Sequence, residues 1–343
     1  METIKISRIL IVGTGSIANK HHKVARNLFP TAEIKAYSES GNSLEGISTL
    51  SDFSEIESFN PDVAVIANTS NRHIRAGVML AKMGVDLLIE KPLSSNMKKV
   101  RTLRRIARRK EITIHVGYNL KFLPSMIHLR KILKEQVVGE IFSVRCVVGQ
   151  DLTDWRPGRE YQSTASASKN KGGGVLNELS HEIDYLTWLF GPPSTVFSVS
   201  GKMSRLEVDC EDSAHLLLTY SQEGKRKYFV SLDMDMIRKD PTRNCTFIGE
   251  KGTLLWDGIL GKISIYNSAE HGWETVFDAS ELMENTYVTE WKMFTGAVSA
   301  KDNLLNNFDS AVETMKIIRL ARISNRLRIP VPKFGVRTKV KVA

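Results

Sequence analysis

Apolar and polar residues alternate in blocks along the N-terminal third of the chain. Short apolar runs are separated by longer stretches in which apolar residues recur at helical spacing. Continuous apolar runs of this length are typical of strands buried on both faces of a sheet. The runs lie within residues 9–12, 33–40, 61–70, 85–89 and 111–116. Strands that alternate with helices in this way predict a parallel, doubly wound sheet.

After residue 139 the pattern changes to a succession of strands. Turns rich in Gly, Asp and Ser separate segments of alternating apolar residues. These segments are residues 140–149, 194–203, 214–221, 225–236, 243–257 and 261–267. Because most of them follow one another without a helix between, we expect mostly antiparallel pairing. Helical spacing returns at residues 287–301 and 310–324.

Length and composition favour two domains. The chain has 343 residues, of which 42% are hydrophobic. No apolar run approaches the ~18 residues of a membrane span, and METIKISRILIVG is too short and strand-like for a secretory signal. We therefore expect a soluble, cytoplasmic protein without membrane insertion. Cys146, Cys210 and Cys245 lie far apart without metal-ligand spacing, so we expect buried, reduced thiols and no metal.

The net charge of +10 raises the question of an acidic partner. Much of it lies in residues 98–110, where Val100, Leu103, Ile106 and Ala107 recur at helical spacing beneath basic residues. A solvated helix face is the favoured interpretation, and attraction to an acidic protein, membrane or polymer is the alternative. The tail 333–343 is also basic, but no nucleic-acid-binding motif accompanies it, so we expect no nucleic-acid partner.

A glycine-rich turn follows the first apolar run and precedes a helical segment. Gly13, Gly15 and Ala18 form the pattern GxGxxA. In dinucleotide-binding proteins the first glycine permits the tight turn, the second lets the backbone approach a pyrophosphate, and the small third residue allows close helix packing. We expect Ser16 and Ile17 to lie at the helix N-terminus, whose N–H groups bind phosphates.

The end of the second strand carries a candidate ribose ligand. Glu39 lies about 20 residues after Ala18, where a carboxylate accepts the ribose hydroxyls of NAD and repels the extra phosphate of NADP. Ser38 and Ser40 could instead hold that phosphate. The sequence therefore favours NAD and leaves NADP open.

Polar residues also stand at the ends of two later strands. Glu90, Lys91 and Pro92 follow the run 85–89, and in open α/β sheets ligands bind just outside this end of the strands. Proline stops the strand and suits the start of a helix, which fixes the direction of Lys91. An ordinary solvated lysine is the alternative. Three further candidates follow the next strand, namely Tyr118, Asn119 and Lys121.

Residues 172–191, GGGVLNELSHEIDYLTWLFG, are expected to form one amphipathic helix after three glycines. Glu178, His181 and Asp184 recur every three residues and so share one face. The glycines leave little bulk, which would let a substrate approach the helix start. A histidine hydrogen-bonded to Asp184 or Glu178, without a chemical role, is the alternative for His181.

The polar loop 151–174 directly precedes this helix. Long loops in compact domains are often functional. Trp155, Tyr161, Arg156 and Arg159 offer an aromatic platform and two guanidinium groups, which suit a sugar ring that carries a carboxylate or phosphate. Alternatively, the arginines pair within the loop with Asp151, Asp154 and Glu160.

Taken together, the motif 13–18, Glu90-Lys91-Pro92, HVGYNLKF and GGGVLNELSHEIDYLTWLFG resemble the glucose-fructose oxidoreductase, inositol dehydrogenase and rhizopine-catabolism (Gfo/Idh/MocA) family. The resemblance runs from about residue 7 to about residue 332. It implies a Rossmann domain at residues 1–122, a substrate and oligomerisation domain with a large, mostly antiparallel open sheet at 123–332, and a basic tail at 333–343. It also implies NAD or NADP as cofactor and a homodimer or homotetramer.

The resemblance assigns roles to individual residues. It implies that Lys91 and His181 are the proton carriers of a hydride transfer between nicotinamide and a sugar carbon. Ser70 and His73 would lie near the nicotinamide, although Ser70 could instead cap the helix that follows. Many members carry an aspartate four residues before the histidine, where this chain has Asn177. Glu178 or Asn177 would then contact the substrate.

Three classes of function fit these features. The intact Glu-Lys-Pro motif and His181 favour a dehydrogenase or reductase acting on a sugar. DWRPGREY followed by ELSHEIDYL is similar to family members of surface-polysaccharide or acidic-sugar pathways, and this resemblance implies a sugar or nucleotide-sugar substrate. Asn177 favours a nucleotide-binding sensor on the same fold. Residues 98–110 would support a protein that binds an acidic polymer.

Overall fold

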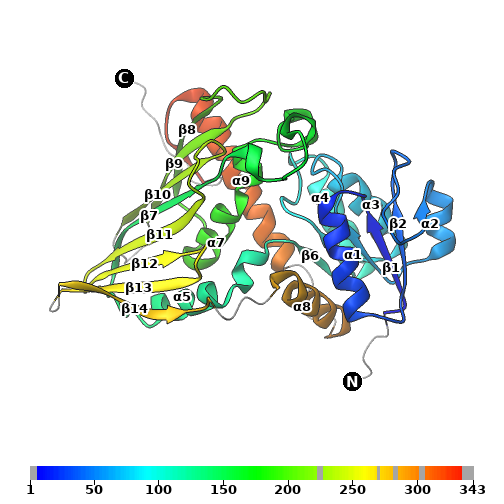
Figure 1. Ribbon diagram of the computed structural model, residues 1–343, viewed down its shortest axis with the longest axis horizontal. Coiled ribbons are helices and arrows are strands. Elements are labelled where there is room, and N and C mark those ends of the chain that lie inside the picture. The colour runs from blue at the N-terminus through cyan, green and yellow to red at the C-terminus, as the bar shows by residue number, and fades with distance from the viewer. Residues whose placement is uncertain (1–5, 222–226, 269–270, 281–284, 301–305, 334–343) are drawn as a thin grey trace. The chain divides into compact units, whose positions relative to one another are not determined.

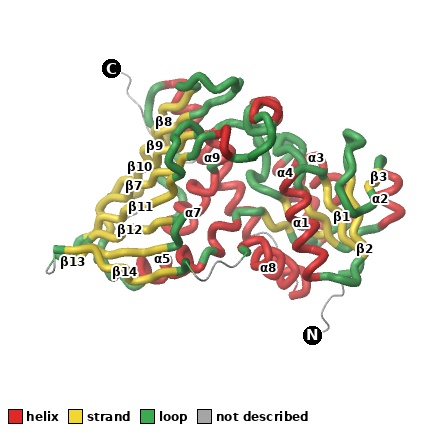
Figure 2. Tube along the Cα trace, viewed as in Figure 1, coloured by secondary structure: helices red, strands yellow, loops and turns green. Residues whose placement is uncertain are grey.

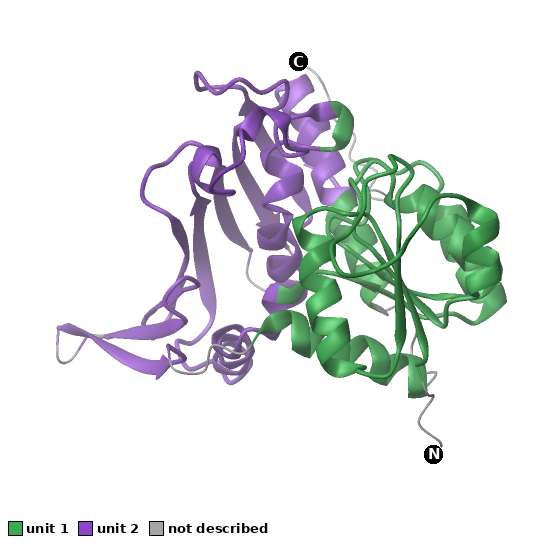
Figure 3. Ribbon diagram, turned by 45° about the vertical axis from the view of Figure 1, so that its right-hand side comes forward, with its two compact units in different colours: residues 1–119, 170–172, 284–315 green, residues 120–169, 173–283, 316–343 purple. Residues whose placement is uncertain are grey.

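The computed structural model describes residues 6–221, 227–268, 271–280, 285–300 and 306–333. The chain divides into two compact units (Figure 3). The first unit comprises residues 1–119, 170–172 and 284–315, and the second unit comprises residues 120–169, 173–283 and 316–343. The first unit therefore includes a late segment that the expected boundary at residue 122 had placed in the second domain.

The first unit is built on a parallel sheet of six strands in the order β3-β2-β1-β4-β5-β6. Strands β1, β2 and β6 of this sheet are labelled in Figure 1. The expected doubly wound sheet is confirmed. The strands are β1 (Arg8–Val12), β2 (Glu33–Tyr37), β3 (Thr49–Leu50), β4 (Val63–Ile66), β5 (Asp86–Ile89) and β6 (Ile114–Val116). The strand order reverses between β1 and β4, and a ligand crevice is expected at such a reversal.

Helices cover both faces of this sheet because successive residues of each strand point to opposite sides. Leu10 and Val12 of β1 face α2, α3, α4 and the start of α9. Ile9 and Ile11 face α1 and α8. The helices are α1 (Ser16–Leu28), α2 (Phe53–Phe59), α3 (His73–Met83), α4 (Val100–Lys110), α8 (Thr286–Ala300) and α9 (Asn306–Leu327), the last continuing into the second unit.

The second unit is built on a sheet of nine strands in the order β14-β13-β12-β11-β7-β10-β9-β8-β15. All neighbours pair antiparallel except β7 and β10, which are parallel, so the mostly antiparallel sheet is confirmed. The strands are β7 (Ile141–Gly149), β8 (Thr195–Gly201), β9 (Ser213–Tyr220), β10 (Tyr228–Asp235), β11 (Thr242–Gly249), β12 (Thr253–Asp257), β13 (Lys262–Asn267), β14 (Gly272–Asp278) and β15 (Val331–Pro332).

Helices pack against one face of the nine-stranded sheet (Figure 2). The core between them joins inward strand residues to Leu129 of α5 (Pro124–Lys134), Leu186 of α7 (Ser180–Phe190) and Ile317 of α9. All three cysteines are free and buried, as expected. Within the described residues, no helix is long and apolar enough to cross a bilayer.

Two details of the expected elements need revision. Residues 172–191 do not form one helix, because the backbone breaks at Leu179 between α6 (Val175–Glu178) and α7. Leu179 has φ −98° and ψ 27°, outside the helical region, although its side chain stays on the apolar side of the segment. The basic tail expected at 333–343 lies outside the described residues apart from Lys333.

Candidate active site

The turn between β1 and α1 has the geometry that a dinucleotide requires. Gly13 has φ +116°, and a Cβ there would lie 2.7 Å from the carbonyl oxygen of Ala67. Gly15 is the N-cap of α1, and a Cβ on it would point into open space. The first N–H groups of α1, from Ser16 onward, therefore follow a residue without a side chain to cap them, and a pyrophosphate can approach them. Ala18 is fully buried.

Glu39 is exposed beyond the end of β2 and lies close to two arginines of the segment after β4. Arg72 Nη1 lies 3.3 Å from Glu39 Oε2, and Arg75 Nε lies 4.0 Å from Glu39 Oε1. Ser38 Oγ and Ser40 Oγ are 3.0 Å apart. A carboxylate suited to ribose hydroxyls thus stands beside two cations that would attract a phosphate.

The backbone at Lys91 is held by a chain of buried hydrogen bonds. Glu90 Oε2 accepts the N–H of Lys91 at 3.0 Å, and Glu90 Oε1 lies 2.8 Å from His21 Nε2. Trp291 Nε1–H donates to His21 Nδ1 at 3.0 Å. Because indole nitrogen only donates, Nδ1 must be the acceptor and Nε2–H must donate to Glu90. Trp291 thereby sets the tautomer of His21, and His21 sets the position of Glu90.

This network also keeps Glu90 ionised. Burial alone would raise the pKa of the Glu90 carboxyl, but the hydrogen bond from His21 and the positive charge of Lys91 outweigh it, and the pKa is lowered. The first unit therefore holds a buried carboxylate beneath the backbone of Lys91.

His73 holds the other side of the same segment. Its ring is buried at the start of α3, with Nδ1 3.0 Å from the carbonyl oxygen of Pro92 and Nε2 3.0 Å from that of Asn68. Burial lowers the pKa of His73 although both carbonyl contacts favour protonation. The ring thus lies between the residue after Lys91 and the end of β4, and in its neutral form it donates its one N–H to one of the two carbonyl oxygens. A cofactor contact for His73 remains a prediction.

The neighbouring candidates of the first unit have their own partners. Ser70 Oγ donates to the carbonyl oxygen of Gly172 at 3.4 Å, and Arg72 occupies the N-cap of α3, so Ser70 does not cap that helix. Tyr118 is buried in the core, and Asn119 Nδ2 donates to Thr286 Oγ1 at 3.1 Å. Their expected contacts with ligands remain predictions.

In the second unit, His181 lies in the first turn of α7 beside a buried ion pair. Lys121 Nζ is 3.0 Å from Asp184 Oδ2, and both side chains are buried. Asn177 is buried as well, with Nδ2 donating to the carbonyl oxygen of Gly173 at 3.4 Å. Glu178 and His181 are partly exposed. The break at Leu179 separates Asn177 and Glu178 from the helix that carries His181, so they share no continuous helical face.

Protein atoms occupy the space beside the second and third of the three glycines. A Cβ on Gly173 would lie 2.4 Å from the carbonyl oxygen of Ala165, and one on Gly174 would lie 2.8 Å from the Glu211 carboxyl. Gly174 also has φ +106°. The expectation that these glycines open the helix start to a substrate was therefore wrong at both positions, because they allow close approach of the protein's own backbone and side chains instead.

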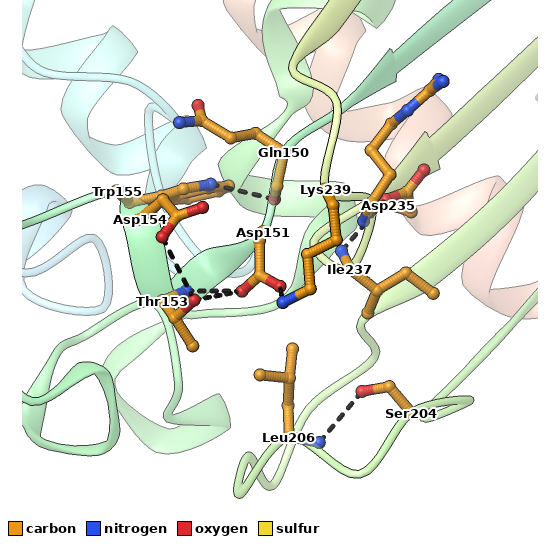
Figure 4. Close-up of polar contacts among 11 residues, drawn as sticks. Gln150, Asp151, Thr153, Asp154, Trp155, Ser204, Leu206, Asp235, Ile237 and Lys239 are labelled. Atoms are coloured by element: carbon orange, nitrogen blue, oxygen red, sulfur yellow. Dashed lines mark hydrogen bonds and ion pairs between the residues drawn. The ribbon is translucent and has the colours of Figure 1, made fainter.

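The loop after β7 is fixed by an acidic residue (Figure 4). Asp151 is buried, accepts the N–H of Thr153 at 2.9 Å and forms an ion pair with Lys239. Trp155 Nε1–H donates to the carbonyl oxygen of Gln150 at 3.1 Å, which leaves its ring partly exposed. The partner of Asp151 is thus a lysine of the β10–β11 connection and not an arginine of its own loop.

Arg156 and Arg159 keep guanidinium groups without an acidic partner within the described part of the chain. Arg156 Nη1 donates to Ser166 Oγ at 3.4 Å, and Arg159 is exposed. The alternative in which both arginines pair with acids of their own loop is not observed. Their availability to an anion is consistent with the expected role in substrate binding.

Three buried groups near these candidates were not among the expected site residues, and local pattern could have identified only His21. His21 is on the same buried face of α1 as Ala18 and Ala25, so its burial follows from helical spacing. Trp291 is 270 residues away from it in sequence and carries no local signal. Glu182 is fully buried in α7, where Arg243 Nε lies 2.7 Å from its Oε1.

A doubly wound sheet with this glycine turn is typical of a dinucleotide-binding domain, and here a second unit with a large open sheet accompanies it. The chain belongs to the GFO/IDH/MocA family. The sequence model of the family's N-terminal domain, described as "Oxidoreductase family, NAD-binding Rossmann fold", matches residues 7–118. The sequence model of the GFO/IDH/MocA C-terminal domain matches residues 126–255. It is therefore a member of an NAD-binding oxidoreductase family.

Three proteins illustrate what the chain is similar to. The rhizopine catabolism protein MocA of Rhizobium meliloti is 26% identical over 203 residues, which span 56% of this chain and 60% of that protein. Levoglucosan dehydrogenase in complex with NADH and levoglucosan has a TM-score of 0.78 at 17% identity, covering 95% of this chain and 99% of the other. The WlbA dehydrogenase of Bordetella pertussis in complex with NADH and UDP-GlcNAcA has a TM-score of 0.76 at 17% identity, covering 97% of this chain and 99% of the other. The structural likenesses establish the fold.

Proposed function

We propose that the protein is an NAD-dependent oxidoreductase that transfers a hydride between nicotinamide and a hydroxyl or carbonyl carbon of a sugar or nucleotide sugar. The observation that carries the proposal is the double attachment of the backbone around Lys91, by Glu90 on one side and His73 on the other. Such support holds a reacting side chain on rigid backbone, as proton transfer requires. The sugar dehydrogenases of similar fold support this substrate class.

The bound nicotinamide supplies the hydride chemistry, and the chain must handle the proton of the hydroxyl group. We assign this task to Lys91 and His181, one carrying the proton and the other orienting the hydroxyl. Asn177 and Glu178 bind substrate hydroxyls near His181. Trp155, Arg156 and Arg159 bind an anionic part of the substrate. Lys121, Tyr118 and Asn119 are further substrate-binding residues in this proposal.

Other parts of this proposal concern the protein's setting. We propose a homodimer or homotetramer located in the cytoplasm, with a role in surface-polysaccharide or acidic-sugar metabolism. Gel filtration with light scattering tests the first part, since a monomer at micromolar concentration would contradict it.

The first experiment is a fluorescence titration with NADH and with NADPH. We expect preferential binding of NADH because Glu39 repels the extra phosphate of NADPH. In Glu39→Ser, Arg72 and Arg75 lose their carboxylate, so the ratio of the NADPH to the NADH dissociation constant should fall by about tenfold or more. If neither nucleotide binds the wild-type protein, the dehydrogenase proposal is wrong.

A non-catalytic sensor is the second candidate, and Asn177 is the residue that favours it. A screen of sugars, sugar acids and nucleotide sugars for NADH production or consumption separates the two. Turnover of any of them that is lost in Lys91→Ala supports the enzyme. Tight binding of both nucleotide and sugar without turnover, in wild type and in Asn177→Asp, would support the sensor.

A further inference from the structure

A band of basic side chains covers the outer side of α4 in the first unit. We define the α4 basic face as Lys98, Lys99, Arg101, Arg105, Arg108, Arg109 and Lys110, all of which are exposed. Four of these arginines recur at positions i, i+4, i+7 and i+8, so they form a single stripe along the helix. The stripe extends for about 12 Å at 1.5 Å per residue.

These charges are not balanced within the protein. Arg104, at the edge of the stripe, pairs with Asp309 at 2.6 Å. The seven residues of the α4 basic face have no ion pair with any residue that the structure describes. The proposed chemistry of the first unit does not use them either.

Part of the arrangement also opposes the stability of the helix, although Arg108, Arg109 and Lys110 stand in the last turn, where cations are favourable. Lys98, Lys99 and Arg101 stand at the N-terminal end of α4, whose first turn contains no acidic residue, and cations are unfavourable at that end of a helix. Arg101 with Arg105, and Arg105 with Arg109, place like charges at i and i+4, where they repel. A polyanion bound along the stripe would relieve both effects.

We propose that the α4 basic face binds the surface of an anionic phospholipid membrane, reversibly and without insertion. The apolar residues of α4, among them Leu103 and Ile106, are buried in the core of the first unit and so are not available to enter lipid. Binding then depends on attraction between guanidinium groups and lipid phosphates, which clusters of four to eight basic residues on a helix provide. This surface lies outside the proposed reaction and does not depend on it.

The chemistry of the face favours lipid over nucleic acid. Residues 95–113 contain no aromatic side chain on which bases could stack. The stripe contains cations alone, without the Asn or Gln side chains that read base edges in a duplex groove. Arginine, with its planar fork of donors, matches phosphate oxygens at any point of a continuous surface.

The test is co-sedimentation of the full chain with vesicles of phosphatidylglycerol and phosphatidylcholine, compared with vesicles of phosphatidylcholine alone. We expect binding only to the anionic vesicles, with affinity that falls steeply between about 0.05 and 0.5 M NaCl because the interaction is screened. Arg101→Glu/Arg105→Glu/Arg109→Glu should lower the affinity by more than about tenfold. The neutral variant with glutamine at the same three positions should show a smaller loss.

Lys23→Glu/Lys82→Glu/Lys134→Glu is the matched control, since it makes the same change in net charge at exposed helical positions elsewhere. It should retain most of the vesicle binding, and all variants should keep the circular dichroism spectrum of the wild type. Equal losses in both sets would show a dependence on net charge alone and overturn the proposal. Binding to duplex DNA but not to anionic vesicles would also overturn it, in favour of a nucleic-acid surface.

Discussion

The surroundings of Lys91 and of His181 differ in how they fix a side chain. Lys91 sits in a non-helical segment whose backbone is held by Glu90 and His73, and that hold extends through His21 to Trp291. His181 sits on a regular helix that follows a backbone break, with the buried pair of Lys121 and Asp184 one turn away. A lysine on irregular backbone needs specific side chains to define its position, whereas a histidine on a helix is positioned by the helix itself.

The strongest way to challenge this comparison is to remove each candidate proton carrier. Lys91→Ala and His181→Ala should each reduce kcat by about 10² to 10⁴, the usual contribution of a general acid or base. Steady-state kinetics measure the loss, and unchanged NADH binding in a titration is the control for folding. If either variant keeps the kcat of the wild type, the residue that was replaced does not carry the proton.

The next largest effect is a loss of stability when the buried ion pair on the helix of His181 is broken. Lys121→Met removes the buried cation opposite Asp184, and breaking a buried pair costs about 3 to 5 kcal/mol of unfolding free energy. Urea denaturation measures it. The double variant Lys121→Met/Asp184→Asn should recover part of the loss, since it also removes the buried negative charge. No recovery would mean that the charge of Asp184 is not the cause.

A smaller loss of unfolding free energy is expected when Glu90, which holds the backbone of Lys91, is replaced. In Glu90→Gln one of the two donors, His21 Nε2–H or the N–H of Lys91, faces an amide N–H₂ group, at a cost of about 1 to 3 kcal/mol. Because the pKa of Glu90 is lowered on folding, its ionisation stabilises the fold above the unfolded pKa of about 4.3. That contribution is lost as pH falls toward the folded pKa.

The difference in unfolding free energy between wild type and Glu90→Gln should therefore shrink between about pH 5 and pH 3. Denaturation at a series of pH values measures it, and Glu39→Gln, which changes an exposed carboxylate, is the control. A difference that does not vary with pH would argue against a lowered pKa.

The smallest loss of unfolding free energy is expected at Trp291, which ends the hydrogen-bond chain through His21 and Glu90. Trp291→Phe keeps an aromatic ring but removes the donor to His21 Nδ1, so the tautomer of His21 is no longer fixed, at a cost of about 0.5 to 1.5 kcal/mol for the hydrogen bond. Kinetic measurements distinguish a positioning role from a general disturbance, because loss of positioning lowers kcat and leaves NADH affinity unchanged. If NADH affinity falls in the same proportion, the effect is a general disturbance of the first unit.

Local pattern was sufficient for most of the expected elements and for the glycine turn. The run Ile9 to Val12 followed by Gly13 and Gly15 determined both the strand and the start of α1, because backbone geometry there depends on neighbours in sequence. The open sheet and its mostly antiparallel pairing were foreseen from its strands and turns, whereas the strand order, β14 and β15 were not. Burial of His21 also follows from helical spacing.

Tertiary partners could not be foreseen in the same way. The apolar spacing of residues 172–191 continues through Leu179, so the break between α6 and α7 left no trace in it. The contact of Trp291 with His21 depends on the return of residues 284–315 to the first unit, which periodicity does not encode. The arginines beside Glu39 were missed for the same reason, because they follow a different strand.

The return of residues 284–315 has a consequence for biosynthesis. After Lys91 has been incorporated, the ribosome adds about 200 more residues before it reaches Trp291. At 5–20 residues per second this takes roughly 10 to 40 s. During this interval the parallel sheet lacks α8, and His21 and Glu90 lack the indole that completes their network. The N-terminal segment therefore stays incompletely covered until residues about 200 positions beyond Lys91 have been synthesised.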